Sequence, residues 1–127
     1  VISRLRSYLR EIAVIRTSPA VAAVGSSEFI VLRPRENGKS KLTPETLLIY
    51  LRSLPVQTIL KWSQDGSAHP RFDEDDLLAI PVPDSVVRIA PKIDALVNEA
   101  LTARAEAARL LEAAKAEVER LVFKTSA

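Results

Sequence analysis

The sequence contains no cysteine and no methionine, and it has only one histidine, one tryptophan and three glycines. Without cysteine, disulfide bonds, cysteine-ligated zinc and thiol catalysis are all excluded. The single His69 has no nucleophile or orienting acid at a spacing typical of catalysis, and one histidine cannot form a metal site alone. Because even the first residue is not methionine, we expect the sequence to be part of a longer chain.

Long hydrophobic segments are also missing. No run reaches the roughly 18 apolar residues that suggest a membrane span, and the first residues do not resemble a signal peptide. The one glycine in the polar loop, Gly66, lacks the lysine-containing pattern of a phosphate-binding loop. We therefore expect a cytoplasmic protein that binds no membrane, no metal and no cofactor of its own.

Charge is present in ordinary amount but is unevenly distributed. The 127 residues are 47% hydrophobic and 27% charged, as in a globular protein of one domain. Residues 1–63 contain ten Lys and Arg against four Asp and Glu, whereas residues 64–127 contain eight against twelve. A basic front half favours contact with a polyanion. The alternative is a chance imbalance of solvated charges.

Short apolar runs and capping residues predict an α+β, or mixed α/β, region over residues 1–83. Strands are expected at residues 1–3, 12–15, 29–32 and 77–80. Thr43 and Pro44 are typical of a helix start, and Pro55 should end that helix and open another. The adjacent acids at residues 73–76 are expected to form a helix N-terminal turn or a solvated run, since their spacing suits no acid–base pair.

Residues 84–127 are predicted to form one long helix of coiled-coil type. After Pro91 there is neither glycine nor proline up to Phe123, and helix-forming residues dominate. Apolar residues recur at intervals of three, four or seven, which is nearly a heptad pattern. This seam is expected to pack against a second helix, through Ile93, Leu96, Ala100, Ala107, Leu111, Ala114, Val118 and Leu121.

Two segments carry the residues expected to contact nucleic acid. Arg4, Arg6 and Arg10 occupy even positions, so an extended backbone would place them on one side. Arginine can bind a phosphate bidentately or read guanine in the major groove. The alternative is that these arginines are simply solvated. The polar loop after the second helix is the other segment, and its candidate residues are Lys61, Ser63, Gln64, Gly66, Ser67, His69 and Arg71.

Several pieces of the chain, in order, resemble the specificity subunit of type I restriction-modification systems. The pieces are VISRLRSYLREIAVI at 1–15, SSEFIVLRP at 26–34, LTPETLLIYLRS at 42–53, VQTILKWSQDGSAHPRF at 56–72 and DLLAIPVPD at 76–84, followed by the alanine-rich helix. They cover nearly the whole chain. The family often continues with Pro-Pro-Leu and then Glu-Gln after the last strand, whereas residues 84–88 read DSVVR here.

The resemblance implies that residues 1–83 are the C-terminal part of a DNA target recognition domain and that residues 84–127 are a spacer helix. In that family the subunit is not catalytic. It reads double-stranded DNA, its spacer helices pack antiparallel, and they bind methyltransferase subunits that hold S-adenosylmethionine. The second spacer helix would come from the same chain or a dimer mate. An incomplete sheet with exposed edges is then expected. Two alternatives stay open: the recognition region of a single-chain DNA methyltransferase or restriction enzyme, and a protein-assembly module without DNA contact.

Overall fold

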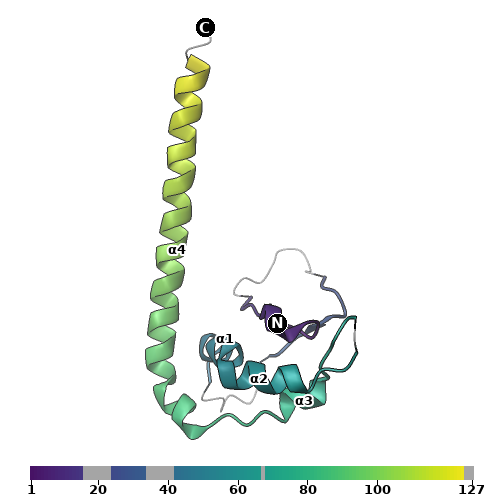
Figure 1. The fold of residues 1–127 in the computed structure, drawn as a ribbon. Coiled ribbons are helices and arrows are strands. Elements are labelled where there is room, and N and C mark those ends of the chain that lie inside the picture. The colour runs from purple at the N-terminus through teal and green to yellow at the C-terminus, as the bar shows by residue number, and fades with distance from the viewer. Residues whose placement is uncertain (16–23, 34–41, 67, 125–127) are drawn as a thin grey trace. The chain divides into compact units, whose positions relative to one another are not determined.

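The computed structural model describes residues 1–15, 24–33, 42–66 and 68–124. The chain divides into two compact units, Val1–Ile93 and Asp94–Ala127. The elements are β1 (Ile2–Ser3), η1 (Ser7–Leu9), β2 (Phe29–Ile30), α1 (Pro44–Arg52), α2 (Leu54–Trp62), α3 (Glu74–Leu78) and α4 (Asp84–Lys124). The four α-helices are labelled in Figure 1. Most of the described chain is helical, with a small sheet and one long helix, which is compatible with the α+β prediction.

The sheet consists of β1 and β2, which pair antiparallel with Ile2 opposite Ile30. On the other side of β1, Ile12 forms a single antiparallel bridge with Ile2, and Val1 and Ala13 exchange backbone hydrogen bonds of 2.8 and 3.0 Å. The strand predicted at 1–3 is confirmed. The strand predicted at 29–32 shortens to two residues, and the one at 12–15 to a bridge. Among the described residues, no further strand borders residues 12–15 to extend the ladder.

The helix-start signals around Thr43 and Pro55 are confirmed. The Thr43 hydroxyl accepts a 3.1 Å hydrogen bond from the Thr46 amide, and Pro44 is the first residue of α1. The first amides of a helix have no carbonyl partner within the helix. The Thr43 hydroxyl supplies an acceptor for one of them, and Pro44 has no amide proton that would need one. α1 ends at Arg52 because Ser53 has an extended backbone, and Pro55 then lies in the first turn of α2.

The strand predicted at residues 77–80 is wrong, because these residues follow or belong to α3. A capping box forms there: the Asp73 side chain accepts from the third helical amide, and the Asp76 carboxylate accepts from the Asp73 amide at 3.1 Å. The acids of the first turn also favour the positive end of the helix dipole. A short apolar run cannot by itself distinguish a strand from a buried helical turn. The prediction that the acids at residues 73–76 form the N-terminal turn of a helix is therefore confirmed. Leu77, which follows them in α3, is buried.

The core of the first unit lies where α2 packs against β1 and the segment before α3. Leu60, Val56, Phe72 and Ile2 are each at most 2% exposed, and the rest of the cluster is Ile30, Leu51, Leu77 and Ile80. Phe72 is the only aromatic side chain among the fully buried residues of this cluster in the described part of the chain, and the others are aliphatic.

α4 begins at Asp84, where the sequence predicted the long helix to start, and it continues through Pro91. Its first turns belong to the first unit: Ala90 is 3% exposed, and the Ala90 carbonyl accepts a hydrogen bond of 3.3 Å from the buried Thr46 hydroxyl. Pro91 lacks an amide proton but is accommodated inside the helix. None of the helices described here combines the length and the apolar composition needed to span a bilayer.

In the second unit, α4 is a solvated amphipathic helix. All side chains of residues 98–123 are exposed. Along it, Arg109 pairs with Glu106, Lys115 with Glu112 and Arg120 with Glu117, each three residues apart. The hydrogen bonds from Arg109 lower the pKa of the Glu106 carboxyl below its ordinary value. The predicted packing residues in this unit, Leu96, Ala100, Ala107, Leu111, Ala114, Val118 and Leu121, are exposed, whereas Ile93, in the first unit, is half-buried.

Candidate nucleic-acid interface

The arginine segment is a turn and not the extended strand that the even spacing suggested. η1 separates Arg6 from Arg10, and both arginines have a left-handed backbone, with φ of 51° and 52°. This conformation costs a residue with a Cβ about 1–2 kcal/mol, so neighbouring contacts must maintain it. The Leu9 amide donates to the Arg6 carbonyl and the Arg10 amide to the Ser7 carbonyl, both at 2.9 Å. We refer to residues 4–10 as the arginine turn.

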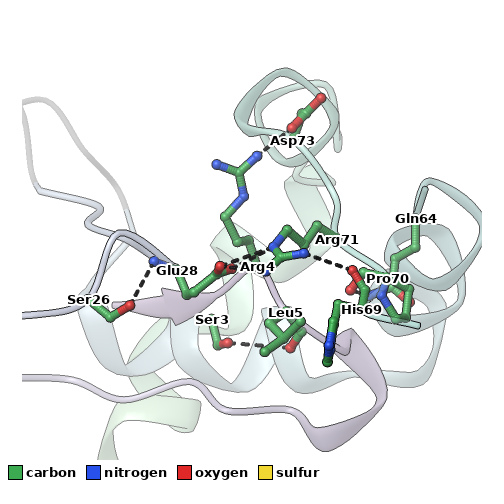
Figure 2. A network of polar contacts seen from close by, with 10 residues as sticks. All are labelled: Ser3, Arg4, Leu5, Ser26, Glu28, Gln64, His69, Pro70, Arg71 and Asp73. Atoms are coloured by element: carbon green, nitrogen blue, oxygen red, sulfur yellow. Dashed lines mark hydrogen bonds and ion pairs between the residues drawn. The ribbon is translucent and has the colours of Figure 1, made fainter. Parts of the chain in front are cut away.

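The fold joins the arginine turn to the loop that sequence analysis singled out independently. The Arg6 amide donates to the Pro70 carbonyl at 2.9 Å, and the Phe72 amide donates to the Arg4 carbonyl at 3.3 Å. Between these bonds, Leu5 and Arg71 form an antiparallel bridge. Residues about sixty positions apart in the sequence are therefore neighbours (Figure 2). Buried Phe72 anchors this junction in the core.

The loop itself is closed by a reciprocal pair of backbone hydrogen bonds between Asp65 and Arg71, of 2.9 and 3.0 Å. Gly66 has φ of 95°, a conformation that favours glycine, and a Cβ added there would come within 3.4 Å of the His69 carbonyl oxygen. Gln64 lies half-buried at its base, with Nε2 at 3.5 Å from the Pro70 carbonyl. Ser67 lies outside the described residues. We call residues 65–71 the recognition loop.

Two of the predicted contact arginines already have acidic partners (Figure 2). The Arg71 guanidinium binds the Glu28 carboxylate, with the closest approach, Nη2 to Oε1, at 2.7 Å, and Arg4 pairs with Asp73. The hydrogen bonds from Arg71 lower the pKa of Glu28, and the same bonds raise the pKa of Arg71. Both charges of the Glu28–Arg71 pair are therefore maintained at neutral pH.

Arg6, Arg10 and Lys61, the other predicted contact residues with a positive charge, form no ion pair among the described residues. Arg10, Lys61 and His69 are exposed and Arg6 is half-buried. They lie on neighbouring elements, because η1 packs against α2, whose last turn carries Lys61. Arg52 of α1 donates to the Arg10 carbonyl at 3.2 Å and adds another positive charge there. Ser63, at the end of α2, donates its hydroxyl to the Ile59 carbonyl at 3.2 Å.

Sequence analysis missed two exposed aromatic residues beside these cations. Trp62, the last residue of α2, is 81% exposed, and Tyr8 of η1 is 58% exposed. Trp62 follows Lys61 at the end of α2, and both side chains are exposed. Large exposed aromatic side chains next to cations are typical of surfaces on which unpaired nucleic-acid bases stack.

Within the described ranges there is no cluster of three or more histidine, aspartate or glutamate residues that could hold a metal ion. An open pocket of about 320 Å³ lies between residues 12–15, residues 31–33 and α1. Its lining is apolar except for Arg33 and the N-terminal amine of Val1, so it offers mainly a packing surface.

A scan against models of protein families, a search of curated proteins and a search of solved structures all found nothing that matches this chain.

Proposed function

We propose that this chain binds double-stranded DNA sequence-specifically, as the C-terminal part of a target recognition domain in the specificity subunit of a type I restriction-modification complex. The observation that carries the proposal is the junction of the arginine turn with the recognition loop. The two segments were selected separately for their residue types, and backbone hydrogen bonds bring them into one surface.

The chemistry of this surface suits DNA. Phosphate contacts supply most of the affinity and fix the register of a protein on DNA, and fewer contacts to base edges supply the selection. Arg6, Arg10 and Lys61 are placed to bind phosphates. Gln64 and His69, on a loop fastened at both ends, have the hydrogen-bonding groups needed for base edges.

The second unit has a different role in this proposal. Its helix exposes an apolar seam that an isolated helix cannot bury, so we expect a second spacer helix, from the same chain or a dimer mate, to cover it. Methyltransferase subunits would bind the same helices. They would supply S-adenosylmethionine and the chemistry, and the chain itself would be non-catalytic.

A protein-assembly module without DNA contact is the second candidate, because the exposed seam and the apolar pocket favour protein partners. The salt dependence of binding distinguishes the two. Phosphate-driven binding weakens steeply with salt, by a factor that reflects the number of phosphates contacted.

The test is a titration of the chain with a pool of duplexes randomised at internal positions, followed by repeated selection of bound duplexes. Binding is then measured at 50 and 200 mM salt for wild type, Arg6→Gln and Arg10→Gln. Each variant should reduce the slope of log affinity against log salt by about 0.9 if its arginine binds one phosphate. Arg88→Gln, which removes an exposed charge from α4, is the matched control. Salt-independent binding, or equal effects of all three variants, would contradict the proposal.

A further inference from the structure

The Arg71 side chain connects three parts of the first unit. Its Nε donates to both carboxylate oxygens of Glu28, at 3.1 and 2.9 Å, and its Nη2 donates to Oε1 at 2.7 Å. Its Nη1 donates to the His69 carbonyl at 3.0 Å. Every nitrogen of the guanidinium is thus engaged within the protein. Figure 2 shows Arg71 between Glu28 and the loop that contains His69 and Pro70.

The backbone around this pair is also connected. The Arg4 amide donates to the Glu28 carbonyl at 2.9 Å, and the Arg4 carbonyl accepts from the amide of Phe72. Glu28 and Arg71 therefore lie on segments that border Arg4 from its two sides, and their ion pair joins these segments beside the first residue of the arginine turn. Arg71 also closes the recognition loop through its backbone bonds to Asp65. Removing the side-chain pair leaves that loop held by its backbone hydrogen bonds and by the 3.5 Å contact of Gln64 Nε2 with the Pro70 carbonyl.

We propose that Glu28 and Arg71 are a positioning pair, which holds the recognition loop in a fixed geometry against the arginine turn, and that neither side chain contacts DNA. The statement about DNA rests on the proposed DNA-binding function. The statement that the pair fixes the loop concerns the free protein and does not depend on that function.

Two other roles for Arg71 predict different results. If Arg71 were a phosphate contact, its loss would lower the salt dependence of binding. If Glu28 instead masked an otherwise DNA-binding Arg71, removing the carboxylate would strengthen binding. The geometry favours positioning, because the His69 carbonyl accepts from Nη1, the one guanidinium nitrogen of Arg71 that does not bind Glu28. The side chains of Arg71 and Glu28 are also only 42% and 30% exposed.

The first experiment needs no DNA. Backbone amide hydrogen exchange is measured in wild type, Glu28→Gln, Arg71→Ala and the double variant. The amides of Asp65 and Arg71, which close the loop, should exchange about two- to fivefold faster in each single variant, as for the loss of a partly exposed ion pair. The double variant should add little. Glu11→Gln removes another exposed carboxylate of the first unit and should leave both amides unchanged. Unchanged exchange in the single variants would overturn the inference.

The second experiment measures binding to the duplex selected by wild type and to a scrambled duplex, at two salt concentrations. Glu28→Gln and Arg71→Ala should both weaken binding to the selected duplex more than to the scrambled one. Glu11→Gln is the control for the loss of a negative charge in Glu28→Gln, and Arg88→Ala is the control for the loss of a positive charge in Arg71→Ala.

Two results would contradict the positioning role. If Glu28→Gln bound the selected duplex more strongly than Glu11→Gln does, Glu28 would be masking Arg71. A salt slope lowered by about 0.9 in Arg71→Ala alone would establish a phosphate contact. Either result overturns the positioning role. If wild type binds neither duplex, the proposed function fails while the exchange data still decide the role of the pair.

Discussion

Whether the apolar seam of α4 packs against a second helix can be tested by substituting one of its residues with glutamate. Ala114 lies on the apolar face of α4 with Leu111 and Val118, which are 71% and 62% exposed. Ala116 lies only two residues away. At about 100° per residue it is on the opposite side of the helix. Ala114→Glu and Ala116→Glu are therefore chemically identical substitutions that differ in the face they alter.

The expected magnitude follows from the burial that a partner helix would impose. An unpaired carboxylate in an apolar interface costs about 3–5 kcal/mol, and the lower value applies because a flexible glutamate can bend toward water. A loss of about 3 kcal/mol weakens association at least about 100-fold. Both substitutions reduce helix propensity by the same small amount, well below 1 kcal/mol, so Ala116→Glu should change association by no more than about twofold.

Sedimentation equilibrium of the whole chain measures the dissociation constant of a dimer through this seam, and far-ultraviolet circular dichroism verifies that the helix persists. We expect wild type and Ala116→Glu to associate alike, and Ala114→Glu to be monomeric over the same concentrations. Equal weakening by the two variants, or a wild-type chain that stays monomeric at the highest accessible concentration, would refute the assignment of this face to a dimer mate.

Three further predictions concern the first unit. Because Trp62 is the only tryptophan of the chain and is 81% exposed, binding of duplex DNA should quench its fluorescence and protect it from iodide, and an unaltered signal at saturating DNA would exclude it from the interface. Phe72→Ala should lower the free energy of unfolding by about 3–5 kcal/mol in urea denaturation, since Phe72 is 1% exposed, and a loss below about 1 kcal/mol would contradict its central position. The folded-state pKa of Glu28 lies below its ordinary value of 4.5, so its pairing stabilises the fold fully above pH 4.5 and stops doing so as pH falls through the folded pKa. Wild type and Glu28→Gln should therefore differ in stability above pH 4.5 and converge as the pH falls through the folded-state pKa of Glu28. A difference that persists in stronger acid would point to another cause.

Signals that act within a few residues determined much of the secondary structure. Thr43 and Pro44 start α1, and Pro55 opens α2, because capping and proline geometry act within one helical turn. The long helix follows from a composition that lacks glycine and contains no proline after Pro91. The exposure of its seam agrees with the expectation that such a helix cannot bury its own apolar face.

Sequence patterns failed where two local signals competed. The apolar run at residues 77–80 suggested a strand, but the capping box formed by Asp73 and Asp76 makes its first part helical. In the arginine segment, even spacing assumed an extended backbone, whereas Arg6 and Arg10 both have positive φ. Such a conformation in residues with a Cβ is maintained by surrounding contacts and leaves no sequence signature.

The sequence alone determined which residue types are available: cations, a polar loop with Gly66 at its turn, a helix with an apolar face, and no cysteine chemistry. Only the tertiary structure decided which of them meet. Arg6 reaches Pro70, and Glu28 reaches Arg71 across 43 positions, because β1 and Phe72 bring distant backbone segments together in the core. Local preferences act over one or two helical turns, whereas contacts between distant segments depend on how the whole core packs.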